Sequence, residues 1–348
     1  MKICLLAGKS DIRGGSTRHI NDIVEGLRAR GHTVEILTYT GNPLRYFKVV
    51  RQHARMVDIV HAIDLNPRGF IGYLATRFTK ARFVISVIGT YAVSPLYSRK
   101  TAWLARIIYS KSDAILSISS FTKKEIEKLV PGVRIQVITP GIDLSNFRDV
   151  NKVHSNKGPY LLSVGSIKKR KGYDIALQAF IRIKREFPDL RYVIVGAHID
   201  EPKFVEKLQQ MTRESGVEGS VDFVKDISDA ELCEYYQNAE LFMLTSVNEG
   251  THFEGFGIVF LEAAAYGLPS IGTSGNGIED AVDDGKTAIL VPQRDVEKTA
   301  DAIRSILTNR SMRETMSENA RKFAIAHDRL ALAARYEDVY LSILNKEN

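Results

Sequence analysis

The chain has 348 residues, of which 44% are hydrophobic and 26% charged, with a formal net charge of +7. This composition is typical of a globular protein and excludes disordered and fibrous classes, and the length favours two domains of ordinary size. The sequence contains no run of about 18 apolar residues, so no membrane span is expected. The short apolar stretch at the N-terminus predicts a first strand and not a signal peptide. The two cysteines, Cys4 and Cys233, lie far apart in apolar contexts. We therefore expect the protein to reside in a reducing cytoplasm and to contain neither a disulfide framework nor a zinc site.

Charge is unevenly distributed along the sequence. Residues 1–150 carry 23 Lys and Arg against 11 Asp and Glu, a net charge of +12, whereas the remaining 198 residues carry 25 against 30, a net charge of −5. A basic half favours an anionic partner, such as a membrane surface, a nucleic acid or a phosphorylated substrate. The alternative is a solvated surface with an excess of Lys and Arg.

Short β-branched apolar runs alternate with amphipathic helical patterns along the whole chain. One helical pattern covers 16–31 and ends at Gly31, a residue type common at helix C-caps. Such alternation predicts parallel sheets covered by helices on both faces. The predicted strands are 2–7, 33–38, 58–62, 82–87, 113–118 and 134–138, followed by 160–165, 191–196, 220–224, 240–245, 269–273 and 287–291.

Two sets of six strands predict an α/β protein with two doubly wound, Rossmann-like domains that face a central cleft, where the carboxyl ends of such sheets bind ligands. We expect the domains at 1–152 and 157–325, because the segment 150–158 is polar and lacks periodicity. The amphipathic segment 326–348 predicts a helix that packs back across the domain boundary.

Two glycine-rich turns stand out. Gly14 and Gly15 follow the first strand and directly precede a helix. Such a pair can cradle a phosphate, but many strand-to-helix turns carry glycine, so the motif is weakly specific. The second turn, 273–280, leads to Glu279, and loop packing is its favoured interpretation.

The segment 97–111 mixes apolar and basic side chains. Trp103, Ile107, Ile108 and two tyrosines alternate with Arg99, Lys100, Arg106 and Lys111. This composition fits an interfacial helix on anionic lipid. The alternative is core packing with a basic rim.

The turn after the strand at 160–165 holds four consecutive cations. Lys168, Lys169, Arg170 and Lys171 precede Gly172, which opens the next helix. Cations at the carboxyl end of a strand suit a diphosphate leaving group. The alternative is a solvated basic turn.

The stretch 253–269, FEGFGIVFLEAAAYGLP, is almost entirely apolar or glycine, yet it contains Glu254 and Glu262. A buried carboxylate is costly unless it is paired. We expect Glu254 in a loop and Glu262 on a helix that begins near Gly257 and ends at Gly267. Because a helix start favours an anion, two hydroxyl-accepting carboxylates around it predict a pyrophosphate between two sugars. The alternative for Glu262 is a surface position on an ordinary helix.

Together, Glu254 with Glu262 and the following AAAYGLP, RKG at 170–172, GG at 14–15 and TPGIDLSNF at 139–147 resemble glycosyltransferase family 4, in particular its bacterial mannosyl- and hexosyltransferases. The resemblance covers nearly the whole chain in the right order. It implies a retaining, metal-independent enzyme of GT-B fold, without a cofactor, that moves a hexose from a nucleoside-diphosphate sugar to an acceptor hydroxyl. The amino-terminal domain would then lie on the acceptor side, and the carboxyl-terminal domain would bind the nucleotide sugar.

The resemblance also implies roles for individual residues. Glu254 would hold the donor sugar, and Lys171 with Arg170 would neutralise the leaving phosphate. The donor-binding residues that it implies are Gly15, Gly165, Ser166, Gly257, Ile258 and Glu262, the last on the ribose. The residues that it implies for sugar or acceptor contacts are His61, Ile88, Gly89, Arg18 and His19.

The sequence departs from the family pattern at two positions. Ser166 stands where the family usually has an arginine, for which Arg170 or Lys169 would compensate. Ile88 stands where a histidine commonly faces the transferred sugar, and an isoleucine side chain cannot donate a hydrogen bond there. These departures leave open a catalytically degenerate binding or regulatory relative. A nucleotide-sugar epimerase or phosphorylase on the same fold is a second alternative, which would need an acid/base pair in the cleft.

The expected partners are a nucleotide-sugar donor, an acceptor in lipid-linked or cell-envelope glycan synthesis, and an anionic membrane surface. We expect the protein in the cytoplasm, peripheral on the inner face of the cytoplasmic membrane. Nucleic acid is not expected, because the sequence lacks an aromatic-basic recognition module. No catalytic base is evident, and the resemblance implies that the leaving phosphate helps to deprotonate the acceptor.

Overall fold

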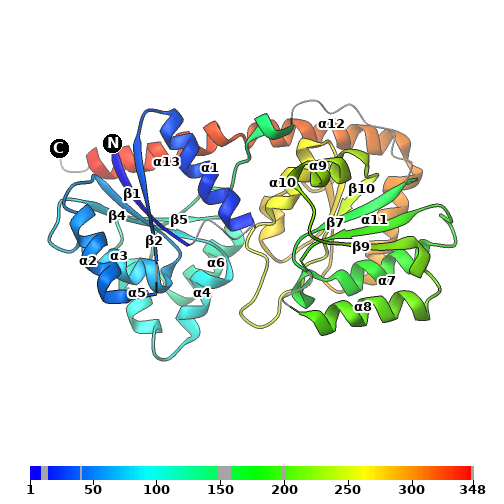
Figure 1. Cartoon of the computed structure of the whole chain (residues 1–348), viewed down its shortest axis with the longest axis horizontal. Helices are drawn as coiled ribbons and strands as arrows, with labels where there is room; N and C mark the ends of the chain where they lie inside the picture. The colour runs from blue at the N-terminus through cyan, green and yellow to red at the C-terminus, as the bar shows by residue number, and fades with distance from the viewer. Residues whose placement is uncertain (9–14, 40, 148–157, 198–200, 346–348) are drawn as a thin grey trace. The chain divides into compact units, whose positions relative to one another are not determined.

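The structure is a computed structural model that describes residues 1–8, 15–39, 41–147, 158–197 and 201–345. The chain divides into two compact units (Figure 1). The first consists of Met1–Ile142 and the segment from His327 onward, and the second of Asp143–Ala326. Most of the predicted linker 150–158 lies outside the described residues.

The first unit contains a six-stranded sheet of order β2-β1-β3-β4-β5-β6, and all of its strand pairs are parallel. Every residue of β3 is buried, as are all but the first residue of β1, which is why these strands consist mostly of apolar residues. The strands confirm the six predicted in this half of the chain: β1 (Lys2–Ala7), β2 (Thr33–Thr38), β3 (Ile59–Ile63), β4 (Arg82–Val87), β5 (Ala114–Ser117) and β6 (Ile135–Val137).

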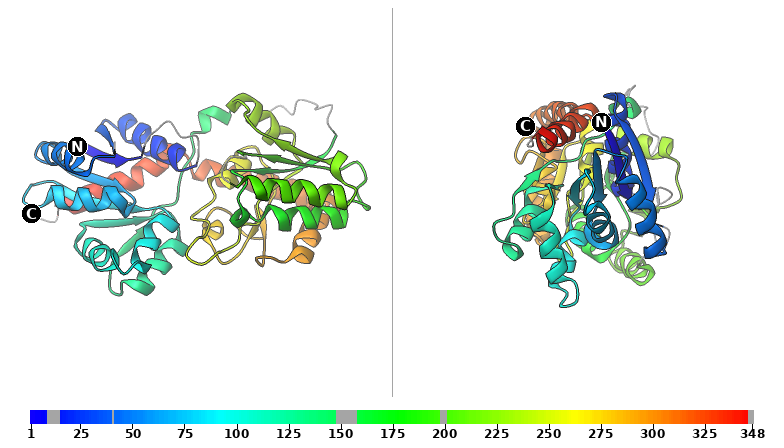
Figure 2. Two further views of the ribbon diagram at one scale, coloured as in Figure 1. Left: turned by 60° about the horizontal axis from the view of Figure 1, so that its bottom comes forward. Right: turned by 90° about the vertical axis from the view of Figure 1, so that its left-hand side faces the viewer.

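Helices cover both faces of this sheet (Figures 1 and 2). On one face, α1 (Gly15–Ala29) packs against α13 (Arg329–Leu344), the helix predicted at the C-terminal end. Leu332, Tyr336 and Tyr340 of α13 share one buried core with Leu5 of β1. The other helices of this unit are α2 (Pro43–His53), α3 (Phe70–Thr76), α4 (Thr90–Tyr97), α5 (Ala102–Lys111) and α6 (Ser120–Leu129).

The second unit contains a parallel six-stranded sheet of order β12-β11-β10-β7-β8-β9. Its strands confirm the other six predictions: β7 (Tyr160–Val164), β8 (Arg191–Val195), β9 (Val221–Val224), β10 (Leu241–Met243), β11 (Ser270–Thr273) and β12 (Ala288–Val291). Its helices are α7 (Tyr173–Ile183), α8 (Pro202–Glu214), α9 (Asp229–Asn238), α10 (Ile258–Ala265), α11 (Val296–Thr308) and α12 (Arg310–Ala326). In Figure 1, α7 and α8 lie on one side of the sheet, and α9, α10 and α12 on the other.

Each sheet is doubly wound and therefore has a point where the direction of winding reverses. In the first sheet this point lies between β1 and β3, and in the second sheet between β7 and β10. Open α/β sheets bind ligands outside the carboxyl ends of the strands at such switch points. We therefore expect a ligand site at the loops that follow β1, β3, β7 and β10.

A buried polar network ties α13 to the first sheet. His61 of β3 is 0% exposed, and its ring nitrogens lie 2.8 Å from Ser86 Oγ and 2.7 Å from the Tyr340 hydroxyl. The hydroxyl of Tyr336 lies 3.3 Å from the same Ser86 Oγ. Burial, assisted by the neighbouring His19, lowers the pKa of His61 to about 3. The ring is therefore neutral, with one nitrogen donating a hydrogen bond and the other accepting one.

We expect Tyr340→Phe to destabilise the protein by about 1–3 kcal/mol, because a buried ring nitrogen of His61 loses its partner. Urea denaturation with an unchanged slope would measure this loss. The control is Tyr91→Phe, because Tyr91 is 73% exposed and its substitution should change the stability by less than about 0.5 kcal/mol. Equal effects of the two substitutions would show that the network does not hold α13.

Candidate functional site

The basic turn after β7 is locked against the loop after β10. Gly172 has a φ of 70°, and a Cβ at this position would lie 1.8 Å from the carbonyl oxygen of Thr245. Thr245 Oγ1 in turn donates to the Gly172 carbonyl at 2.7 Å. The amide of Val247 donates to the carbonyl of Arg170 at 2.8 Å. Glycine alone permits this approach, so Gly172 sets the distance between the two loops.

The two loops bring three predicted residues together around one carboxylate oxygen. Glu254 Oε2 lies 2.6 Å from Lys171 Nζ and 3.2 Å from a terminal nitrogen of Arg170. Ser246 Oγ donates to the same oxygen at 3.3 Å. Glu254 is 9% exposed and the Lys171 side chain 13% exposed. A solvated turn is therefore the wrong interpretation for Lys171.

Charge in this group is unbalanced. Burial alone would raise the pKa of Glu254, but Lys171 and Arg170 outweigh burial and hold the pKa below its ordinary value. Burial lowers the pKa of Lys171, although Glu254 opposes this effect. Two cations thus face one carboxylate, and the excess positive charge in a low-dielectric environment favours an additional anion.

Glu262 is the second carboxylate of the predicted pair. It lies on α10 and is 3% exposed, so the predicted alternative of a surface position is wrong. Tyr236 of α9 donates its hydroxyl to Glu262 Oε2 at 2.8 Å. The Tyr236 ring stacks on Tyr266, with centroids 5.6 Å apart and planes 7° from parallel. This stacking fixes the hydroxyl that orients the carboxylate.

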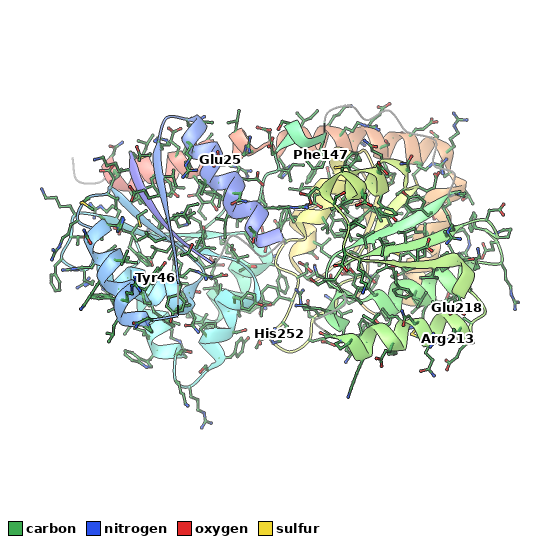
Figure 3. All side chains as sticks on the ribbon, viewed as in Figure 1. Glu25, Tyr46, Phe147, Arg213, Glu218 and His252 are labelled. Carbon is green, nitrogen blue, oxygen red and sulfur yellow. The ribbon has the colours of Figure 1, made fainter. Side chains whose placement is uncertain are left out.

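The loop between β10 and α10 folds back on itself, because Glu249 N donates to His252 O at 2.8 Å, with His252 exposed (Figure 3). It ends at Gly257, whose φ is 89° and which precedes α10 without a side-chain cap. Ile258, the first residue of α10, is half-buried. The first backbone amides of α10 therefore directly follow a residue whose positive φ suits glycine.

The glycine-rich turn at 273–280 packs against this loop. Gly277 N donates to the Glu254 carbonyl at 2.9 Å, and a Cβ at Gly277 would lie 2.0 Å from the Gly255 carbonyl oxygen. Glu279 accepts from the amide of Gly275 at 2.7 Å. These contacts confirm the predicted role of loop packing.

Gly165 and Ser166 follow β7 at the same edge of the sheet. Gly165 has a φ of 143° and accepts a hydrogen bond from the Tyr173 hydroxyl at 2.7 Å. A Cβ at Gly196 would lie 1.9 Å from the Gly165 carbonyl oxygen. Ser166 is half-buried. Gly165 in this turn and Gly196 directly after β8 thus permit a close backbone approach between the two loops.

The predicted residues of the first unit have different environments. Gly15 begins α1, Arg18 is exposed, and Gly14 lies outside the described residues. His19 is 2% exposed, burial lowers its pKa to about 4, and its Nδ1 has no hydrogen-bond partner among the described residues. His61 has both ring nitrogens bonded within the core. It therefore offers no free nitrogen to a sugar, and we do not include it in a site.

Ile88 and Gly89 follow β4 in the first unit. The Ile88 side chain packs against the hydrophobic core, while its amide donates to Asp64 Oδ1 at 2.9 Å. Gly89, with a φ of 60° and a ψ of −135°, precedes α4. At the position where the family commonly has a histidine, the chain thus offers a backbone amide to Asp64, while the side chain packs against the core.

Sequence analysis missed three residues of these constellations. Ser246 and Asp64 each lie shortly after a strand, at an edge where ligands bind, so their position along the chain was an available signal. Tyr236 lies within a helix, and its pairing with Glu262 depends on tertiary packing. No group of three or more His, Cys, Asp or Glu side chains in the described part of the chain could hold a metal ion.

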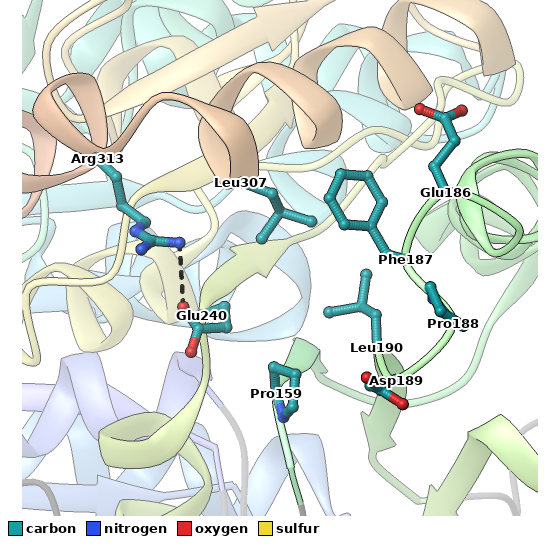
Figure 4. A pocket seen from close by; sticks show the side chains of 9 residues that line it. All are labelled: Pro159, Glu186, Phe187, Pro188, Asp189, Leu190, Glu240, Leu307 and Arg313. Atoms are coloured by element: carbon teal, nitrogen blue, oxygen red, sulfur yellow. Dashed lines mark ion pairs between the residues drawn. The ribbon is translucent and has the colours of Figure 1, made fainter.

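A shallow pocket of about 420 Å³ lies at the opposite edge of the second sheet (Figure 4). Phe187, Leu190 and Leu307 line it, and Arg313 pairs with Glu240 there at 3.3 Å. None of the predicted site residues lines this pocket. It borders the amino ends of the strands, so it is not the candidate site.

Comparisons with known proteins agree with the predicted family. The family model "Glycosyl transferases group 1" matches residues 146–323, and "Glycosyltransferase Family 4" matches residues 40–146. The chain is 26% identical to a D-inositol 3-phosphate glycosyltransferase of Corynebacterium urealyticum, over 95% of this chain and 82% of the relative. It is 28% identical to a GDP-mannose-dependent alpha-(1-6)-phosphatidylinositol monomannoside mannosyltransferase of Mycobacterium tuberculosis, over 67% of this chain and 63% of the relative. The chain thus spans less than two thirds of the length of that mannosyltransferase.

Solved structures share the fold. Anabaena HepE in complex with UDP superposes with a TM-score of 0.83 at 20% identity, covering 98% of this chain and 100% of HepE. A glycosyltransferase from Rickettsia africae superposes with a TM-score of 0.82 at 20% identity, covering 99% of each chain. Since the group 1 model covers more than half of the sequence, the chain belongs to the group 1 glycosyl transferases, preceded here by a family 4 segment, and has the GT-B fold.

Proposed function

We propose that this glycosyltransferase moves a hexose from a nucleoside-diphosphate sugar to an acceptor hydroxyl, with retention of configuration and without a metal ion. The observation that carries the proposal is the group of Arg170, Lys171 and Glu254 at the switch point of the second sheet, in which the Lys171 and Glu254 side chains are largely buried. Its excess positive charge suits a diphosphate, and its carboxylate suits sugar hydroxyls.

The donor would lie along the carboxyl edge of the second sheet. Lys171 and Arg170 would contact the diphosphate, assisted by the amides that follow Gly257 at the start of α10. Glu254 would accept hydrogen bonds from the hexose, and Glu262, held by Tyr236, from the ribose. The other proposed donor contacts are Gly15, Gly165, Ser166 and Ile258.

Transfer would proceed on one face of the sugar. The bond between the anomeric carbon and the leaving phosphate oxygen breaks, and the acceptor oxygen bonds to the carbon on the same face. The acceptor proton passes to an oxygen of the leaving phosphate. Lys171 and Arg170 would stabilise the negative charge that develops on the diphosphate, a preorganised electrostatic contribution.

Two of the similar proteins support the donor class. The Mycobacterium tuberculosis relative is GDP-mannose-dependent, and a structure of the Anabaena protein contains UDP-glucose. We therefore propose GDP-mannose and UDP-glucose as the first donors to test.

Donor binding can be tested by thermal shift with UDP-glucose, GDP-mannose and ADP-glucose. A donor at about 100 times its Kd stabilises the folded state by about 2.7 kcal/mol and so raises the melting temperature. We expect one nucleotide to give the largest increase, and a proton NMR time course with that donor should show retained anomeric configuration in the first product. No shift with any of the three donors would contradict the proposed function.

Lys171→Ala should lower the rate of nucleoside-diphosphate release at saturating donor by about 10²- to 10³-fold, because the leaving group loses a preorganised cation. Lys171→Arg should retain part of the rate, since it keeps the charge. The matched control is Lys286→Ala, which removes an exposed lysine that pairs with Asp283 and should leave the rate unchanged. An unchanged rate in Lys171→Ala would exclude the assigned role.

We further propose that the first unit binds an anionic membrane surface through α4, α5 and the turn between them. Trp103 and Ile107, one helical turn apart on α5, are 60% and 41% exposed, and Tyr97 is 54% exposed. Arg99 and Lys100 are exposed in the turn before α5. Amphipathic surfaces of this kind bind anionic lipid, and a lipid-linked acceptor would explain the location. None of the described helices is long and apolar enough to cross a membrane.

Flotation with vesicles of phosphatidylglycerol and phosphatidylcholine would test this surface. We expect binding to the anionic vesicles that salt weakens, and loss of binding in the double variant Trp103→Ser/Ile107→Ser. Ile325→Ser is the control, because Ile325 is an apolar residue of the second unit that is 64% exposed. If the protein floats with neither anionic nor neutral vesicles, the membrane proposal fails.

A further inference from the structure

Asp64 has a backbone conformation that is unusual for its residue type. It directly follows β3, at the switch point between β1 and β3, with a φ of 64° and a ψ of 165°. This region of backbone space is populated almost only by glycine, and other residues occupy it at a cost in stability. The chain nevertheless has a side chain here, which points to a use for the carboxyl group.

The surroundings hold this residue firmly. The Asp64 amide donates to the Ser86 carbonyl at 2.8 Å, and the Asp64 carbonyl accepts from the Gly69 amide at 3.1 Å. Asp64 Oδ1 accepts from the Ile88 amide at 2.9 Å. The residue is 6% exposed. Its Oδ2 has no hydrogen-bond partner among the described residues, so one carboxylate oxygen is fixed while the other remains available as an acceptor.

The charge of the carboxyl group is sensitive to its environment. Burial raises the pKa of Asp64 to about 7, although the Ile88 amide and Arg68 oppose this effect. The other titratable group that interacts with it is Tyr109, whose pKa is raised well above its ordinary value by burial first and then by Asp64. Near neutral pH, Asp64 is therefore a strong hydrogen-bond acceptor that is only partly ionised.

We propose that Asp64 binds the acceptor, with Oδ2 accepting a hydrogen bond from a hydroxyl of a polyol such as a sugar or an inositol. This assignment rests on the proposed hexosyl transfer. The Ile88 amide holds Oδ1 and thereby orients Oδ2 for the hydroxyl. Ile88 thus supports hydroxyl binding through its backbone, although its side chain cannot form a hydrogen bond. A purely structural role is the rival explanation, and in that case asparagine would serve equally well, because it also offers an oxygen to the Ile88 amide.

The chain offers a matched control in Asp113. This aspartate also accepts a hydrogen bond from a backbone amide, in this case that of Phe83 in β4, at 2.7 Å. It precedes β5 and so lies at the opposite edge of the same sheet. Asp113→Asn thus makes the same substitution at an aspartate that accepts from a backbone amide, without touching the carboxyl edge.

The transfer test uses GDP-mannose and UDP-glucose as donors. The acceptors are D-inositol 3-phosphate, myo-inositol and the methyl glycosides of mannose and glucose, and free hexose reports transfer to water. In Asp64→Asn, transfer to the polyol should fall by about 10- to 100-fold, the effect of losing a hydrogen bond to a charged group. Donor KM and hexose release to water should stay within about twofold, as should all rates of Asp113→Asn. Wild-type transfer should rise as the pH passes through about 7, and Asp64→Asn should lack this rise.

Three outcomes would overturn the assignment. Full transfer by Asp64→Asn, with normal donor binding, would overturn the assignment of Asp64 and leave the proposed function standing. Wild-type protein that hydrolyses a donor but glycosylates none of the four polyols would exclude a polyol acceptor. Wild-type protein that binds no donor would overturn the proposed function, and this assignment with it.

Melting temperatures provide a readout that needs no acceptor. Because the pKa of Asp64 in the folded protein, about 7, exceeds its ordinary 3.8, the folded state binds more protons between these values. Stability from this group therefore falls as the pH rises through that window. The melting temperature of Asp64→Asn relative to wild type should be higher at pH 8 than at pH 5. Asp64→Gly, which also removes the backbone strain, should melt no lower than wild type at pH 8. A pH-independent difference, or strong destabilisation by glycine, would support the structural role instead.

Discussion

The ion pair between Lys171 and Glu254 is the constraint on which the organisation of the second unit depends. A carboxylate that is 9% exposed is tolerated only when cations reach it, so the loops after β7 and β10 must approach each other closely. Gly172 permits one close approach and Gly277 another, since a Cβ at either position would overlap a backbone carbonyl. The glycines, the cations and the carboxylate therefore form one structural device. A change in any of them alters the geometry of the others.

The two units handle buried polar groups in opposite ways. In the second unit, Lys171 and Arg170 hold the pKa of Glu254 below its ordinary value despite burial, and Glu254 opposes the lowering of the Lys171 pKa by burial. In the first unit, burial lowers the pKa of His61 and raises the pKa of Asp64, and both shifts favour the neutral form of the side chain. This difference between the units would suit the anionic donor and the polyol acceptor proposed above.

The fold could be predicted almost completely from the sequence, because burial on both faces leaves a strong signal in each strand. All twelve predicted strands are present in the described residues, and Gly31 and Gly267 have the positive φ expected at helix ends. The site was predictable only in part. The family resemblance implied that Lys171 and Glu254 serve one donor, but their direct ion pair was not predicted, since 83 residues separate them. The partners Ser246 and Tyr236, and the conformation of Asp64, depend on tertiary contacts and backbone angles that local patterns do not encode.

The placement of α13 has a consequence for how the chain folds. Leu332, Tyr336 and Tyr340 belong to the same core as Leu5, so the first sheet cannot bury that face until residues more than 300 positions away arrive. On a ribosome, the second unit would be fully synthesised while the first still exposes apolar surface. Contacts so distant in sequence form slowly, and exposed apolar surface invites association with other chains. The first unit should therefore be the last to mature and the first to need a chaperone.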